Sequence, residues 1–249
     1  MKIWHSEFLQ NYGTYTFGYG VYASLEKSDK LSAIYEQGFL PYSGSKEVTD
    51  SLYMARSARV SLPQFEPSSE NRRILKKFDG VFTKSPVTAA TFAEDKERIA
   101  FALSYFAKRH DAKLMPEERL KLILAHAVAP CAVQYEKDGK LAALTLLDGD
   151  TAMQHFWYSF YDLSMVDQSL GMWLMLDAAR DAKAEGKEHF YVGTVYGEKA
   201  LYKTNFPALS WWDGKDWQED VSALKARART DSERTAGGRD VWKAEEELF

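Results

Sequence analysis

The sequence predicts an α+β protein whose mixed sheet is flanked by helices, and two segments carry this prediction. Residues 155–161 are almost unbroken aromatic and apolar, residues 170–183 change to helical periodicity, and residues 189–193 form a second short apolar run. This order is typical of a strand, a crossover helix and a parallel strand. Upstream, Asp138-Gly139 separates two strand-like runs, which is a strong signal for an antiparallel hairpin.

Length and composition limit the class of protein. The 249 residues are 45% hydrophobic with a formal net charge of −4, which fits a globular protein and argues against indiscriminate nucleic-acid binding. Cys131 is the only cysteine, so disulfides within the chain and cysteine-based metal sites are excluded, and we expect a buried thiol on the first hairpin strand. No signal-peptide pattern and no apolar run of membrane length is present, so we predict a cytoplasmic protein without a membrane partner or a metal.

The elements outside these two segments are predicted from periodicity and turn residues. Residues 51–62 are expected to form a single strand, with Arg56 and Arg59 pointing to opposite faces. Three further helices are predicted, over residues 25–37, 94–110 and 119–128.

A basic helix is predicted after residue 68. Residues 51–84 carry seven basic and three acidic side chains, a local charge of +4, although the whole chain is acidic. Ser68 or Ser69 can cap the helix, and helical spacing places its basic residues on adjoining strips. Such strips suit phosphates, but a merely solvated face has the same pattern. The strips consist of Arg72, Arg73, Lys76 and Lys77.

The start of the 170–183 helix resembles an anion-binding turn. Its first-turn N–H groups have no partner inside the helix, and the helix dipole adds positive potential. Gln168, Ser169 and Gly171 are similar in spacing to the Q/R-x-x-G-x-G/A pyrophosphate loop of GNAT acyltransferases. Trp173 stands where that loop has a small residue, so we expect coenzyme A not to fit. An ordinary helix start capped by Ser169 is the alternative.

Several short segments follow one another in a characteristic order. They are residues 65–77, Tyr158-Ser159-Phe160-Tyr161-Asp162, Ser169-Leu170-Gly171, Tyr191-Val192-Gly193 and Leu201-Tyr202-Lys203. In this order they resemble the C-terminal domain of the arginyl-tRNA and leucyl-tRNA protein transferases, over roughly residues 35–215. The resemblance implies a GNAT-like fold that uses aminoacyl-tRNA as its co-substrate, with no other cofactor.

The resemblance also implies a domain plan and an activity. Residues 1–84 are expected to form an N-terminal subdomain with the basic helix, residues 85–220 the GNAT-like transferase domain, and residues 221–249 a charged tail. The implied activity moves an amino acid from aminoacyl-tRNA to the N-terminal α-amine of a protein or peptide. A GNAT enzyme that uses acyl-CoA and a non-catalytic tRNA-binding protein are the alternatives.

The expected site follows from the chemistry of this transfer. An aminoacyl ester is already activated, so the reaction needs alignment, removal of a proton and stabilisation of an oxyanion. Asp162, at the end of a buried strand, is the candidate for holding or deprotonating the acceptor amine, or else it simply forms the turn. Tyr158, Tyr202 and Lys203 are expected to line the pocket for the tRNA 3′ end, with Lys203 against phosphate and Tyr202 as a hydrogen-bond donor or stacking surface. The alternative for the two tyrosines is packing in the core. By the resemblance, Gly193 joins the substrate-binding set together with Gln168, Ser169 and Gly171.

Overall fold

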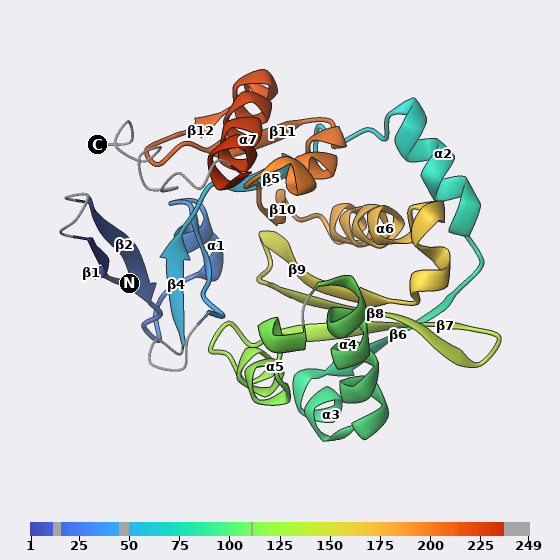
Figure 1. Ribbon diagram of the computed structural model, residues 1–249. Helices are drawn as coiled ribbons and strands as arrows, with labels where there is room; N and C mark the ends of the chain where they lie inside the picture. Colours follow the sequence, from blue (N-terminus) through green and yellow to red (C-terminus); the bar gives the residue numbers. More distant parts are fainter. Residues whose placement is uncertain (12–15, 45–49, 111, 237–249) are drawn as a thin grey trace.

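A computed structural model describes residues 1–11, 16–44, 50–110 and 112–236 (Figure 1). Its side-chain description leaves out residues 7–11, 16–17, 166–168 and 233–236. Two sheets lie side by side, a smaller one at the N-terminus and a larger one that carries most of the helices. No helix of the described part is both long and apolar enough to cross a membrane.

The small sheet has four strands in the order β1-β2-β4-β3, all antiparallel. Its hydrophobic core is shared with the large sheet, because Phe39 and Leu52 pack in one cluster with Met153 and Tyr191. The two sheets therefore bury a common interface. The elements of this part are β1 (Lys2–Asn11), β2 (Thr16–Ser24), α1 (Leu31–Tyr35), β3 (Phe39–Pro41) and β4 (Ser51–Met54).

The large sheet has eight strands in the order β12-β11-β5-β10-β9-β8-β7-β6. Strands β9 and β10 are parallel, and every other neighbouring pair is antiparallel. The prediction of an α+β fold with a mixed sheet flanked by helices is confirmed. The strands are β5 (Ser57–Ser61), β6 (Thr83–Thr88), β7 (Cys131–Lys137), β8 (Lys140–Gly149), β9 (Met153–Tyr161), β10 (His189–Thr194), β11 (Leu209–Trp212) and β12 (Trp217–Gln218).

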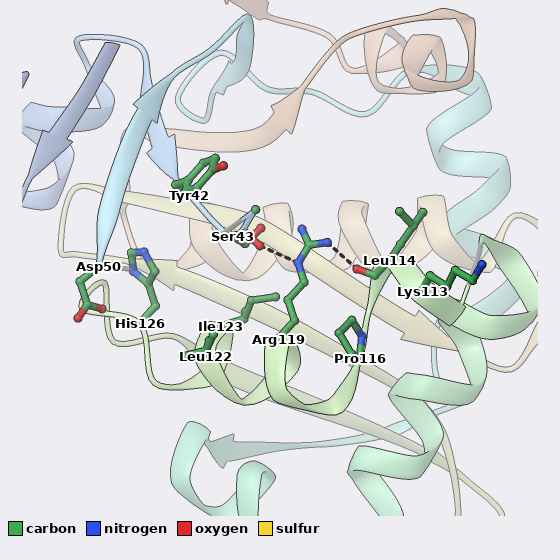
Figure 2. A pocket seen from close by; sticks show the side chains of 11 residues that line it. Tyr42, Ser43, Asp50, Lys113, Leu114, Pro116, Arg119, Leu122, Ile123 and His126 are labelled. Carbon is green, nitrogen blue, oxygen red and sulfur yellow. Dashed lines mark hydrogen bonds between the residues drawn. The ribbon is translucent and has the colours of Figure 1, made fainter. Parts of the chain in front are cut away.

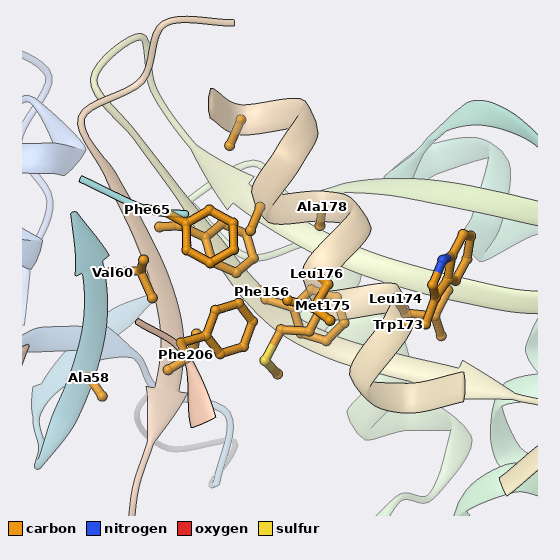
Figure 3. Packing of buried hydrophobic residues seen from close by; sticks show 14 of the residues in the cluster. Ala58, Val60, Phe65, Phe156, Trp173, Leu174, Met175, Leu176, Ala178 and Phe206 are labelled. Carbon is orange, nitrogen blue, oxygen red and sulfur yellow. The ribbon is translucent and has the colours of Figure 1, made fainter. Parts of the chain in front are cut away.

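Helices cover both faces of the large sheet. Alternation along β8 explains this, because Ala143 and Leu147 face one cluster while Leu144 and Leu146 face another. The first cluster is formed with α2 (Ser69–Phe78) and α6 (Leu170–Ala184). Figure 3 shows the apolar side chains of α6 packed against the sheet. The second is formed with α3 (Ala89–Glu94), α4 (Lys96–Arg109) and α5 (Glu117–Leu124), while η1 (Ala112–Leu114) connects the last two.

Residues 221–236 form α7 (Val221–Ala236), which packs into the main core through Leu224 and Ala228. Among its charged side chains, Arg229 is exposed, Lys225 and Arg227 are half-buried, and Asp231 is buried. Residues 237–249 lie outside the described residues. The domain boundary expected after residue 84 stays a prediction. The sheets themselves divide earlier, between β4 and β5.

Four local predictions were wrong. The strand expected over residues 51–62 is two strands in different sheets, because the chain turns at Ala55 and Arg56. The helix expected over 25–37 is only α1. The helix expected over 94–110 is interrupted at Asp95, whose side chain accepts from the backbone N–H groups of the next turn and starts α4. Cys131 is exposed rather than buried, because it begins β7.

Candidate active site

Strands β9 and β10 diverge after three paired residues. Their parallel pairing joins Met153 to His189 and ends with His155 opposite Tyr191. Beyond this point Gly193 takes a left-handed φ of +81°, and the pairing of β10 with β5 shifts register at the same place. A left-handed residue without a side chain lets the strand turn away here. The carboxyl ends of parallel strands are where ligands bind in sheets of this kind.

The side chain of Lys203 reaches this point from η3 (Glu198–Asn205). Its Nζ donates a hydrogen bond of 2.9 Å to the carbonyl of Thr194, and a Cβ placed on Gly193 would stand 3.3 Å from it. Burial lowers the pKa of Lys203 to about 8. An ammonium group has three donors. Among the described residues Lys203 has no carboxylate partner, so two of its donors are available to a substrate.

A buried histidine faces the same point from β9. His155 Nε2 lies 3.7 Å from the position of a Gly193 Cβ, and the side chain is only 2% exposed. On its other side, His155 Nδ1 lies 2.8 Å from Asp148 Oδ2 and 3.0 Å from the hydroxyl of Tyr35. Tyr35 in turn donates to Asp148 Oδ1. Lys203, Gly193 and His155 are thus brought together by three different elements.

Tyr202 and Gly171 lie near the end of β9. A Cβ on Gly171 would stand 2.8 Å from the hydroxyl of Tyr161, so this aromatic ring requires glycine at the start of α6. The side chain of Tyr202 is 46% exposed and interacts electrostatically with Tyr161. Ser169 has a left-handed φ of 70° and makes no side-chain cap, so the simple capping role is wrong. The side chain of Gln168 lies outside the described residues.

Asp162 has the contacts of a turn-forming residue. Its side chain is exposed and accepts a hydrogen bond of 2.9 Å from the backbone N–H of Ser164, at the start of η2 (Leu163–Gln168). Its own N–H bonds the carbonyl of Ala142. These contacts explain Asp162 without a substrate, and its role toward the amine stays a prediction.

Tyr158 lies beside a separate pocket. Its hydroxyl is 2.8 Å from Ser43 Oγ, and burial raises the pKa of Tyr158. Ser43 lines a pocket of about 220 Å³ between the end of the small sheet and α5 (Figure 2). In this pocket Arg119 donates to the carbonyls of Ser43 and Leu114. Tyr158 therefore contacts this pocket through its hydrogen bond with Ser43.

The basic helix has the predicted form. Ser68 caps α2 through a capping box with Asn71, and the apolar side of the helix is buried against α6. Its four basic side chains are all exposed, and Arg73 pairs with Glu70 at 2.5 Å. The exposed set is Arg72, Arg73, Lys76 and Lys77, and its contact with tRNA stays a prediction.

The steric argument against coenzyme A is wrong. Trp173 points away from the turn into the core that α6 shares with α2. Its ring packs against Phe78 and Phe82. Its Nε1 donates to Asp79 at 3.2 Å. The indole therefore leaves the N-terminus of α6 unobstructed.

Comparison with known proteins finds one matching family and several curated relatives. The family described as "Arginine-tRNA-protein transferase, C terminus" matches residues 97–213. Curated relatives named aspartate/glutamate leucyltransferase include one from Cereibacter sphaeroides, 27% identical over 175 residues. Another, from Chromobacterium violaceum, is 25% identical over 206 residues. These matches support the aminoacyl-tRNA–protein transferase family for this chain.

The match covers unequal parts of the relatives. The alignment spans 66% of this chain and 61% of the Cereibacter sphaeroides protein, against 80% of each for the Chromobacterium violaceum protein. Solved structures similar to the chain include FemX, with a TM-score of 0.45 and 9% identity, covering 70% of this chain and 63% of that one. A tandem GNAT protein from the clavulanic acid biosynthesis pathway has a TM-score of 0.41 and 13% identity, covering 77% and 61%.

The site predicted from sequence is only partly assembled in the structure. Gly193 and Lys203 meet at the divergence of β9 and β10, and His155 joins them although the sequence did not single it out. The register of the β8–β9 hairpin, which places Asp148 opposite His155, was the signal that could have found it. Tyr202 lies on η3 next to Lys203. The other predicted residues lie on α2, at the start of α6, in the turn after β9 or beside the pocket of Figure 2.

Burying Lys203 has a cost that a stability measurement can detect. Below pH 8 the folded and unfolded states both carry the charge, so the folded state bears the full cost of burial. Between about pH 8 and pH 10.5, the ordinary pKa of lysine, Lys203 loses its proton in the folded state before it does so in the unfolded state. The free-energy cost of burying the charge therefore falls to zero over this range. Lys203→Met is therefore expected to raise the unfolding free energy at pH 7 by about 1–3 kcal/mol, with a gain that vanishes by pH 10.5, in urea titrations.

Lys84 provides the matched control for this measurement. Burial pulls its pKa down, but hydrogen bonds to Asp177 and Asp181 raise the pKa overall. A pKa raised on folding contributes stability below the unfolded pKa, so Lys84→Met should be less stable than the wild type at pH 7. Equal decreases of stability in the two variants would contradict a costly burial of Lys203.

Proposed function

We propose that this chain transfers an aminoacyl group from aminoacyl-tRNA to the N-terminal α-amine of a protein or peptide. Similarity to the transferase family supports the reaction class. The observation that supports the position of the site is the buried ammonium group of Lys203 beside Gly193. The relatives are named aspartate/glutamate leucyltransferase. Leucyl-tRNA is therefore the first donor to test, with arginyl-tRNA second, and an N-terminal aspartate or glutamate is the first acceptor.

Lys203 supplies the electrostatic part of the chemistry in this proposal. Attack by the amine turns the ester carbonyl into a tetrahedral oxyanion, which must be stabilised. The Thr194 carbonyl fixes Nζ through one hydrogen bond, and the remaining two N–H groups can donate to the oxyanion. Burial strengthens these bonds because the surroundings have a low effective dielectric constant. This assignment replaces the role toward phosphate that the sequence suggested for Lys203.

Charged tRNA is a cytoplasmic substrate, and a cytoplasmic location goes with the proposal. The reaction requires no cofactor besides the aminoacyl-tRNA, because the ester is already activated. Because Trp173 packs in the core and leaves the start of α6 open, acyl-CoA is an alternative donor that the transfer assay must test.

A transfer assay tests the proposal. Purified protein is incubated with leucyl-tRNA or arginyl-tRNA and a peptide with an N-terminal aspartate, and the peptide mass is measured. We expect the mass to rise by one aminoacyl residue. Lys203→Met should lower the transfer rate by about a hundred- to a thousandfold, the range for removing an oxyanion donor.

Lys199→Met is the control, because Lys199 is an exposed lysine of the same 3₁₀ segment. It should transfer at the rate of the wild type. Wild-type protein that modifies the peptide only with acetyl-CoA would establish the acyl-CoA reaction instead. Protein that binds tRNA but modifies nothing would indicate a tRNA-binding protein without activity.

The exposed face of α2 is proposed to contact tRNA phosphates. Reversing Arg72 and Lys76, which lie one helical turn apart, should weaken tRNA binding at low salt. It should also flatten the dependence of log K on log salt by about 0.7–0.9 for each phosphate that the variant no longer binds. Fluorescence anisotropy at several salt concentrations measures both quantities.

Lys27→Glu with Lys30→Glu makes the same charge change on an exposed loop before α1, at the opposite side of the molecule from α2 (Figure 1). This control should leave the salt slope near that of the wild type. Identical slopes in both double variants and in the wild type would show that the α2 face is only solvated.

A further inference from the structure

We propose that His155, oriented by Asp148, is the general base that takes the proton from the attacking amine. This inference rests on the proposed transfer reaction and names a further catalytic residue for it. Three features support this role: the nitrogen of His155 that carries the proton, the groups that face its other nitrogen, and the difference between His155 and the second buried histidine, His126.

The surroundings of Nδ1 decide the tautomer. Asp148 Oδ2, 2.8 Å away, is a carboxylate oxygen and accepts. The hydroxyl of Tyr35, 3.0 Å from Nδ1, uses its proton to donate to Asp148 Oδ1 and therefore also presents an acceptor. Both neighbours of Nδ1 are thus acceptors, so Nδ1 carries the hydrogen. In the neutral ring Nε2 is then left with a free lone pair.

Nε2 points to the position where the reaction is proposed to occur. It makes no hydrogen bond with any described residue, and it faces the missing side chain of Gly193, as Lys203 Nζ does. A base and a cation therefore lie 3.7 and 3.3 Å from one point. A substrate bound there has donors for its oxyanion on one side and a proton acceptor for its amine on the other.

The second buried histidine lacks this arrangement. His126 is 6% exposed, and its Nε2 lies 3.2 Å from the carbonyl of Ser51 while its Nδ1 accepts from the N–H of Val128. Both of its nitrogens are occupied by backbone groups, so His126 has a structural role. His155 differs because only one of its nitrogens is occupied.

The proton transfers balance over the whole reaction. The neutral α-amine attacks the ester carbon, a C–N bond forms, and the carbonyl electrons move to the oxygen facing Lys203. His155 Nε2 takes the extra proton from the nitrogen, directly or through one water. As the intermediate collapses, the C–O bond to the ribose breaks, and the imidazolium gives its proton to the leaving ribose oxygen. The products are an amide and uncharged tRNA.

Two charged groups lie near the His155 ring. Asp148 on β8 is 2.8 Å from Nδ1, and the Lys203 ammonium on η3 is near the same Gly193 Cβ position as Nε2. Tyr35 on α1 and Tyr191 on β10 border the ring as neutral phenols, and Trp157 separates it from His126. Protonating His155 in the free enzyme removes the lone pair that the reaction needs.

The pH dependence of transfer provides the test. At acidic pH the acceptor amine and His155 must each lose a proton, so log(kcat/KM) for the peptide should rise with pH with a slope approaching two. His155→Gln should lower the rate by about a hundred- to ten-thousandfold and reduce that slope to one. Its affinity for tRNA and its urea midpoint distinguish a defect in chemistry from a defect in folding. His126→Gln, the control, should keep the slope of the wild type.

Nitrogen NMR of histidine-labelled wild-type protein gives a reading that needs no variant. We expect Nδ1 of His155 to be protonated and Nε2 to be bare in the neutral ring. A protonated Nε2, or a His155→Gln variant that transfers at the wild-type rate, overturns the role of His155 alone. Wild-type protein that transfers from neither leucyl-tRNA nor arginyl-tRNA overturns the proposed function, and the role of His155 with it.

Discussion

The buried ammonium group of Lys203 is the constraint on which the rest of the site depends. A charge is costly to bury, and a carboxylate partner would remove that cost, yet among the described residues Lys203 has only the carbonyl of Thr194. The position exists because Gly193 lets β10 turn away from β9 and leaves space for Nζ. Groups whose pKa is shifted by burial gather at functional sites, where stability is given up for activity.

The C-terminal helix supports this arrangement from outside. Asp231 on α7 accepts hydrogen bonds from the backbone N–H of Gly197 at 3.1 Å and from Arg56 at 2.7 Å. Ser232, the next residue, accepts from the N–H of Glu198 at the start of η3. These contacts anchor the beginning of the segment that carries Lys203. A stretch that reads as a charged tail in the sequence thus helps to position the reactive lysine.

Features set by neighbouring residues could be predicted from the sequence. The β9–α6–β10 unit, the Asp138-Gly139 hairpin and the cap of α2 follow from periodicity and local hydrogen bonds. Features set by contacts between distant segments could not. The division of residues 51–62 between two sheets depends on which strands they meet, and the contact of Lys203 with Thr194 depends on how η3 folds back. Lys203 and Gly193 were named through resemblance to the family, and His155 was missed because its partners come from α1 and β8.

A structure with a stable mimic of the substrate tests the central claim most directly. The mimic is an adenosine whose ribose carries an aminoacyl group through an amide instead of an ester. The account predicts that its carbonyl oxygen lies about 2.7–3.2 Å from Lys203 Nζ, beside Gly193, with His155 Nε2 facing the carbonyl carbon from the other side. A mimic bound instead in the pocket lined by Ser43 and Arg119, with Lys203 still bonded only to Thr194, would contradict it.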